Sequence, residues 1–201
     1  MTLSFFRFSG IGARLWAFAM MGLARRPMAR LDGIGFWKLF GSGVGEGFTP
    51  LPNTAVYAVL ATWPDLETAR QRTENAPIFR RYQAWSSENW TVFLNPASAR
   101  GAWSGQTPFL PQATLPRGPL AALTRATIRP RNLLKFWRRA PAISGVIGAD
   151  PNVAFKIGIG EVPWLQQVTF SIWPDPESMA RFARNPQGPH AQAIRAVRQG
   201  D

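Results

Sequence analysis

Apolar and polar positions follow two different periods along the chain, and the switches between these periods mark its elements. Short runs rich in β-branched and aromatic residues predict strands, and longer runs with apolar residues three and four apart predict helices. The first half of the chain predicts strands at 3–8, 36–40, 55–62 and 89–94, and helices at 12–31, 66–75 and onward to Trp85. The second half predicts strands at 120–128, 153–159 and 166–172, and helices from Asn132, Pro176 and Pro189.

The order strand, helix, strand, strand, helix, strand is that of a ferredoxin-like unit, and the second half repeats it. One such unit leaves a face of its sheet half bare. We therefore expect an α+β fold in which tandem ferredoxin-like repeats fuse into a dimeric-α+β-barrel-like domain. The expected parts are an N-terminal half (1–94), a connector (95–119) and a C-terminal half (120–201). The connector is rich in Pro, Gly and Ser, and Trp103 and Phe109 are its expected anchors.

A Trp-Pro-Asp motif occurs twice, at 63–65 and at 173–175, each time between a predicted strand and a predicted helix. The aspartate of each copy is suited to cap the helix that follows. Downstream of the second motif stands His190, the only histidine of the chain, where the first copy has Arg80. This difference within a repeat is the sharpest functional clue in the sequence.

Composition limits the chemistry that the chain can perform. Its 201 residues contain no cysteine, which excludes disulfides, Cys-ligated zinc, iron–sulfur clusters and a thiolate-ligated haem. A single histidine also excludes an iron site with two histidines and one carboxylate, unless a dimer shares its ligands. Acidic residues are scarce and scattered, and no catalytic side chain can be assigned.

His190 lies in the first turn of the last predicted helix, on an apolar stripe with Ala193, Ile194 and Val197. The positive end of the helix dipole and partial burial both favour the neutral imidazole, which is the form that binds metals. A core histidine bonded to a backbone carbonyl explains the same pattern, and the residues alone favour that alternative.

Positive charge is spread unevenly over a chain with a net charge of +12. Residues 1–31 contain five arginines and no acid, and a second acid-free stretch separates Glu88 from Asp150. Such a surface suits nucleic acid, an anionic membrane or an acidic protein, and a solvated face without a partner explains it equally well. No apolar run reaches the roughly 18–20 residues of a membrane span. We expect a cytoplasmic protein that rests peripherally on a membrane.

Long strings of the sequence resemble the spheroidene monooxygenase family of purple photosynthetic bacteria, which are acyclic carotenoid 2-ketolases. The resemblance runs over most of the chain, and its strings are 3–8, 14–18, 21–25, 33–41, 45–50 and 99–105. It implies oxidation of spheroidene at C-2 to a ketone by successive O₂-dependent hydroxylations and loss of water. A reduced ferredoxin would supply electrons, and haem b would be the cofactor.

The resemblance itself assigns no ligand to the haem iron. With no cysteine and one histidine, His190 is the natural axial imidazole. Haem-binding fused ferredoxin-like barrels, such as dye-decolourising peroxidases and chlorite dismutases, look similar in placing a histidine beneath the haem from a helix. Candidates for the haem propionates or the distal pocket are Lys38, Lys156, which we match to Lys38, and the arginines Arg80, Arg81, Arg181 and Arg184. For any single one of them, the residues alone favour a solvated surface position.

Three aromatic residues, Trp37, Phe40 and Phe48, are candidates for lining a long apolar substrate cavity, although such residues belong to the core by default. The basic surface is expected to meet the photosynthetic membrane, where carotenoids dissolve, and an acidic ferredoxin-type donor. A non-catalytic haem or carotenoid carrier on the same fold is the alternative function. No nucleic-acid partner is expected, because the strands lack the aromatic signature of RNA-recognition sheets.

Overall fold

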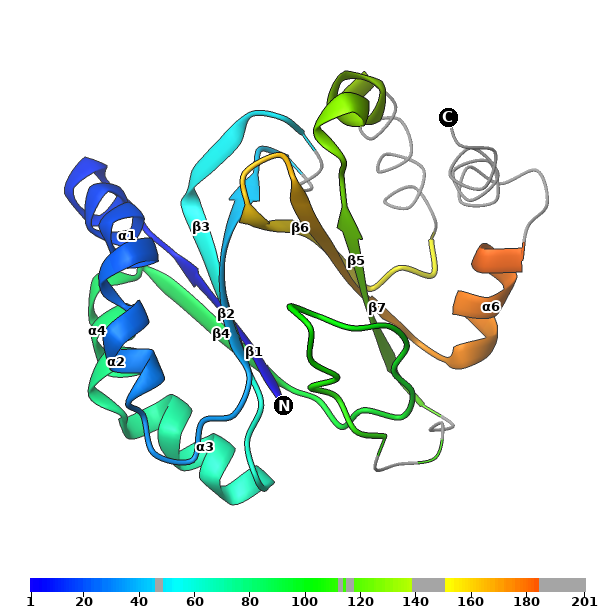
Figure 1. Cartoon of the computed structure of the whole chain (residues 1–201). Helices are drawn as coiled ribbons and strands as arrows, with labels where there is room; N and C mark the ends of the chain where they lie inside the picture. The colour runs from blue at the N-terminus through cyan, green and yellow to red at the C-terminus, as the bar shows by residue number, and fades with distance from the viewer. Residues whose placement is uncertain (46–48, 112–113, 115–117, 139–150, 185–201) are drawn as a thin grey trace. The chain divides into compact units, whose positions relative to one another are not determined.

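The fold of the chain is α+β in a computed structural model that describes residues 1–45, 49–111, 114, 118–138 and 151–184 (Figure 1). The chain divides into two compact units. The first unit comprises residues 1–41 and 53–114, and the second comprises residues 42–52 and 115–201.

The first unit is an antiparallel sheet with helices against one of its faces (Figure 1). Its elements are β1 (Thr2–Arg7), α1 (Ile11–Leu23), α2 (Arg25–Ala29), β2 (Trp37–Gly43), β3 (Pro52–Ala61), α3 (Leu66–Asn75), α4 (Pro77–Trp85) and β4 (Glu88–Phe93). The strands lie in the order β4-β1-β3-β2. β1 pairs antiparallel with both β3 and β4, so that Phe6 faces Tyr57 on one side and Asn89 on the other.

The helical side of this sheet carries the core of the first unit. Strand residues alternate between the two faces, and Phe6, Leu39, Tyr57 and Val59 all pack there as buried residues. The helices complete the core with the buried residues Ala17, Met20, Ala24, Met28, Ile78, Phe79 and Tyr82.

The helix predicted over 12–31 is in fact two helices, α1 and α2, that meet at Ala24. Pro27 explains the break, because proline has no N–H to donate to the carbonyl four residues earlier and its ring clashes with that carbonyl. Ala24 is fully buried at the junction, and its N–H donates to the carbonyl of Met20 at 3.0 Å. The helical conformation was therefore predicted correctly, but the prediction of one continuous helix was wrong.

The second unit also contains an antiparallel sheet. Its elements are β5 (Leu120–Thr127), a 3₁₀ turn at Pro130–Asn132 that leads into helical residues 133–138, β6 (Phe155–Val162), β7 (Gln166–Trp173) and α6 (Pro176–Arg184). The strands lie in the order β6-β7-β5, and β7 pairs antiparallel with both neighbours. The break expected at 185–188 and the helix expected from Pro189 lie outside the described residues.

Among the helices that the structure describes, none has the length and apolarity needed to span a membrane.

Candidate functional site

The two Trp-Pro-Asp motifs form the turns that lead from β3 into α3 and from β7 into α6. Asp65 accepts a hydrogen bond from the backbone N–H of Thr68 at 2.7 Å, and Asp175 accepts one from the N–H of Ser178 at 2.6 Å. These backbone bonds hold the pKa of both carboxyl groups below the usual value, because they stabilise the charged form. The predicted helix caps are confirmed.

The tryptophan of each motif donates a hydrogen bond that fixes the turn to its sheet. The indole N–H of Trp63 donates to the hydroxyl of Thr2 at 2.8 Å, and that of Trp173 donates to the hydroxyl of Ser171 at 3.0 Å. The ring of Trp173 also packs against Phe182 of α6, with centroids 5.2 Å apart. The repeated motif is therefore a structural device, and any chemical difference between the copies lies in the residues around it.

Trp173 identifies the side of the second sheet on which α6 packs. Because side chains alternate along a strand, Gln167, Thr169 and Ser171 of β7 lie on this side together with Trp173. The strand registers add the residues directly opposite them, Lys156, Gly158 and Gly160 of β6 and Leu120, Ala122, Thr124 and Ala126 of β5. We call these eleven residues the α6 face.

Small and polar residues dominate the α6 face. Apart from Leu120 and Trp173, which pair at one end, it offers glycine, alanine, serine and threonine with one glutamine and one lysine. Gln167 and Ser171 are buried there, whereas Thr124 and Ala126 are exposed. The corresponding helical side of the first unit is filled instead by the large side chains of its core.

The apolar core of the second sheet lies on its other face. Ile159, Val168 and Phe170 are fully buried, and the rings of Phe155 and Phe170 are 6.1 Å apart. The α6 face is therefore not needed to bury the bulk of the strand side chains. The α6 face therefore combines small side chains, two buried polar residues and one cation.

Three curated proteins named spheroidene monooxygenase are similar to the chain. The Cereibacter sphaeroides protein is 51% identical over 98% of this chain, and the Rhodobacter capsulatus protein is 47% identical over 98% of this chain and 83% of its own length. The chain belongs to the spheroidene monooxygenase family. The Rubrivivax gelatinosus member is 32% identical over 92% of this chain and 72% of its own length. The chain spans 61% of the length of the Cereibacter sphaeroides member.

No protein-family model matches the chain. Solved structures overlap with it only loosely. A candidate monooxygenase from Fusobacterium nucleatum has 8% identity and a TM-score of 0.40 over 98% of this chain and 85% of its own. An anthrone oxidase-like protein has 10% identity and a TM-score of 0.34 over 98% of this chain and 84% of its own. These overlaps decide neither the fold nor the activity.

Among the residues of this chain that were predicted to bind the cofactor, Lys156 lies on the α6 face directly opposite Ser171. Arg184 is the last residue of α6, and its side chain lies outside the described part. His190 also lies outside the described residues, and its role as axial ligand stays a prediction. In the described part of the chain, no three His, Cys, Asp or Glu side chains gather into a set that could hold a metal ion.

The predicted match between Lys156 and Lys38 is wrong by one position. Lys38 lies on the face of its sheet away from the helices, over the ring of Phe36 at 5.4 Å, whereas Lys156 lies on the α6 face. The residue that corresponds to Lys156 is Trp37, because Phe36 bonds to Thr62 just as Phe155 faces Ile172, the residue equivalent to Thr62. Only the second unit therefore presents a lysine on its helical side at this point.

Two of the three predicted substrate residues, Trp37 and Phe40, lie on opposite faces of β2. Trp37 packs against the core on the helical side of the first sheet. Phe40 is fully buried on the opposite face, where its ring lies 6.0 Å from that of Trp103. Because they lie on opposite faces of β2, Trp37 and Phe40 do not line one cavity. Phe48 lies outside the described residues.

Trp103 and Phe109, the expected connector anchors, are confirmed as ring contacts of the first unit. The ring of buried Trp103 lies 5.6 Å from Phe36 and 6.1 Å from Phe109. The connector therefore covers part of the sheet face that bears no helices. The sequence indicated the anchors but not their partners, because strand pairing determines which residues of β2 face the connector.

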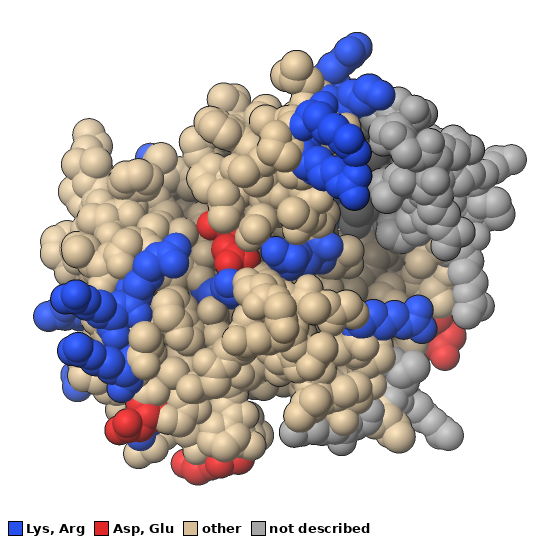
Figure 2. All heavy atoms as spheres, in the orientation of Figure 1, with Lys and Arg blue, Asp and Glu red and all other residues tan. Residues whose placement is uncertain are grey.

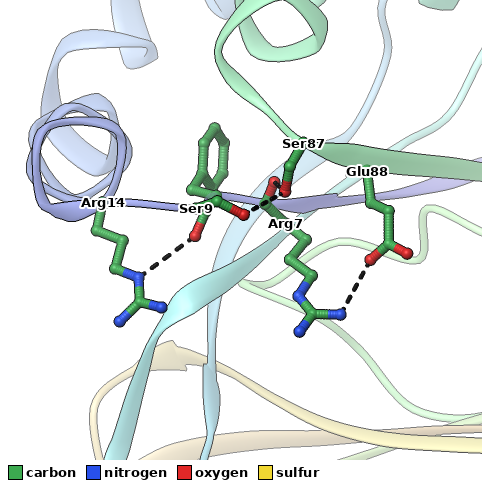
Figure 3. A network of polar contacts seen from close by, with 6 residues as sticks. Arg7, Ser9, Arg14, Ser87 and Glu88 are labelled. Carbon is green, nitrogen blue, oxygen red and sulfur yellow. Dashed lines mark hydrogen bonds and ion pairs between the residues drawn. The ribbon is translucent and has the colours of Figure 1, made fainter.

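A surface network joins the ends of β1 and β4 to the start of α1 (Figure 3). Arg7 pairs with Glu88 at 3.1 Å, and the hydroxyl of Ser9 donates to that of Ser87 at 2.8 Å. Arg14 donates through Nε to a backbone carbonyl just beyond β1 at 3.3 Å. Arg7 and Glu88 are well exposed, so this network connects elements and does not form a desolvated site for acid–base chemistry.

Proposed function

We propose that the chain is a haem-dependent carotenoid monooxygenase that introduces a keto group at C-2 of spheroidene and related acyclic carotenoids. The observation that carries the proposal is its 47% identity with the Rhodobacter capsulatus spheroidene monooxygenase over 83% of that protein's length. The similarity extends over both units of the chain and is not confined to a local motif.

The proposed reaction converts a methylene group into a carbonyl through two hydroxylations of the same carbon. Each hydroxylation consumes one O₂, two electrons and two protons, inserts one oxygen atom and releases one water. The resulting gem-diol loses a further water to give the ketone. The electrons come from an external donor, for which we propose a reduced ferredoxin.

We propose further that the two units are tandem ferredoxin-like repeats of one dimeric-α+β-barrel-like domain, with the connector at 95–119 between halves 1–94 and 120–201. The strand order β6-β7-β5 corresponds to β2-β3-β1 of the first unit. Both units also place an aspartate-capped helix after the equivalent strand. These two correspondences support a duplication.

We propose that haem b binds on the α6 face. Its small side chains leave little bulk above β6 and β7, and Lys156 supplies a cation suited to a propionate. Arg184 ends the helix on the same side, and His190 is the proposed axial ligand on the sequence argument alone. When bound, haem supplies an iron centre that activates O₂. Trp173, buried beneath α6, closes one end of this face to solvent.

The second unit also offers a surface for the electron donor. Basic residues gather after β5 (Figure 2), and those exposed there are Arg129, Arg131, Lys135 and Arg138. An acidic ferredoxin complements such a cluster, because opposite charges steer the two proteins together. Since the carotenoid dissolves in lipid, we place the protein in the cytoplasm, peripherally bound to the photosynthetic membrane.

Turnover with isotopically labelled O₂ tests the proposed function. The haem-loaded protein is mixed with spheroidene in detergent micelles, reduced ferredoxin and its reductase, and the products are analysed by mass spectrometry. We expect a carotenoid ketone that carries label. Spheroidene returned unchanged from a haem-loaded, reduced sample would contradict the enzyme and identify the carrier alternative.

A further inference from the structure

Helix α1 has two apolar stripes on opposite sides. One stripe packs against the core through Ala17, Met20 and the adjoining Ala24. The other points to solvent and consists of Ile11 (80% exposed), Leu15 (65%) and Phe18 (68%). Leu23 (67%) is also exposed, but it lies to one side of this stripe. Ile11, Leu15 and Phe18 follow the four- and three-residue spacing of one helix face. An exposed apolar stripe of this kind marks a contact surface.

A pair of stacked tryptophans flanks this outer stripe. The rings of Trp16 of α1 and Trp85 of α4 lie 5.2 Å apart and nearly parallel, at 4°. Trp85 is 48% exposed at the surface. Amphipathic indole rings at the surface are typical of protein segments that sit at the boundary between lipid and water.

Positive charge surrounds the same helix. Arg14 lies on α1, and Arg25, Arg26 and Arg30 follow it in and just after α2, all of them exposed. No acidic residue occurs in residues 1–31. Figure 2 shows Lys and Arg gathered over this end of the first unit. Anionic lipid headgroups complement such a cluster.

We propose that α1 docks flat on an anionic lipid bilayer, with Ile11, Leu15 and Phe18 in the acyl region and the arginines among the headgroups. At 1.5 Å per residue, its 13 residues extend about 20 Å. This is shorter than the roughly 30 Å of a hydrocarbon core, and the inner stripe is already committed to the protein core. Both facts favour a helix lying in the membrane plane.

The charge pattern favours lipid over a second copy of the chain. A two-fold symmetric contact through the same stripe brings the four arginines of one copy against those of the other, and no acid of residues 1–31 compensates. A bilayer rich in phosphate groups satisfies the arginines and the apolar stripe together.

The choice of a carotenoid-bearing membrane rests on the proposed function. The test of membrane binding itself needs neither haem nor substrate. The full chain is sedimented with vesicles of phosphatidylcholine alone, or of a two-to-one mixture with phosphatidylglycerol. We expect binding to the anionic vesicles, a loss of at least about tenfold in the Leu15→Ser/Phe18→Ser variant, and a loss of roughly tenfold in Arg25→Gln/Arg26→Gln.

Matched controls locate the effect on α1. Leu66→Ser/Leu110→Ser removes equally exposed leucines elsewhere, and Arg129→Gln/Arg131→Gln removes the same charge from the second unit. We expect both controls to bind anionic vesicles like the parent. Equal binding by the parent and the Leu15→Ser/Phe18→Ser variant overturns the proposal. The proposal is also overturned if light scattering shows a dimeric parent that does not bind vesicles and that this variant converts to a monomer.

A label on the helix reports its depth directly. The chain has no cysteine, so Phe18→Cys carries a single environment-sensitive fluorophore. Its emission should shift to the blue with anionic vesicles, while the same label at Leu110→Cys should not shift. A parent that oxidises spheroidene in micelles but shows no vesicle binding contradicts this inference alone. A parent that binds vesicles without oxidising spheroidene contradicts the proposed function alone.

Discussion

Lys156 and Ser171 lie directly opposite each other across β6 and β7, on the face of the second sheet against which α6 packs. The first unit has no lysine at the equivalent place, because its Lys38 points to the other face. A cation beside small residues on a half-buried face distinguishes the two units more clearly than the Trp-Pro-Asp motif that they share.

Replacing this lysine tests its role toward the haem. We expect Lys156→Gln to weaken haem b binding roughly tenfold, because a charge-assisted bond to a propionate is lost. Lys38→Gln removes the same charge from the other unit and should bind haem like the parent. Titration of the apoprotein with haem, followed at the Soret band, gives both affinities. Equal weakening in the two variants would show a general charge effect instead.

Filling the α6 face should exclude the haem. Gly158 is buried in the middle of β6 with an extended backbone, so Gly158→Val suits the strand and adds bulk where the ligand is proposed to lie. We expect haem stoichiometry to fall in a variant whose thermal melt shows that it still folds. A Gly158→Val protein that binds haem as fully as the parent would place the cofactor elsewhere.

The connector anchor should be important for stability. Trp103→Ala empties a buried site between Phe36, Phe40 and Phe109 and is expected to cost about 3–5 kcal/mol. Trp90→Ala serves as the control, because Trp90 is 45% exposed and stacks on Phe5. Urea unfolding of both variants measures the difference. A smaller loss for Trp103→Ala than for Trp90→Ala would contradict the anchoring role.

The helix caps predict a dependence of stability on pH. Hydrogen bonding to Thr68 lowers the pKa of Asp65 in the folded state below its usual value of 3.8. The capping contribution is therefore fully present above that value and is lost as the pH falls through the lowered pKa. We expect Asp65→Asn to unfold more easily at neutral pH and to lose less stability on acidification. An acid dependence identical to that of the parent would exclude the cap as its source.

The exposed ion pair should contribute little. Arg7 and Glu88 lie 3.1 Å apart with 63% and 69% of their side chains exposed (Figure 3), and such pairs are worth about 0–1 kcal/mol. A double-mutant cycle with Arg7→Met and Glu88→Gln should give a coupling energy within that range. A coupling above about 2 kcal/mol would mean that the pair is shielded from water.

Local rules predicted those parts of the fold that depend on a few neighbouring residues. The caps at Asp65 and Asp175 follow from residue type and position. The junction at Ala24 was missed, although Pro27 is a local signal for it. Each of these features is determined within one or two turns of helix, which is the range over which sequence patterns are reliable.

Features set by strand pairing could not be predicted in the same way. The match of Lys38 to Lys156 was wrong by one residue, and a shift of one residue places a side chain on the other face of a strand. By contrast, the positions of Trp37 and Phe40 on opposite faces could have been predicted, because side chains alternate along a strand. The α6 face as a whole required the registers of β5, β6 and β7, which connect residues far apart in the chain.

The central claim is a haem held by the second unit through His190, and the absorption spectrum of the haem-loaded chain tests it most directly. Arg80 holds the equivalent position after the first motif, so Arg80→Ala is the control for His190→Ala. We predict the Soret and visible bands of an imidazole-ligated haem in the parent and in Arg80→Ala, and their loss in His190→Ala. Unchanged bands in His190→Ala would contradict the claim.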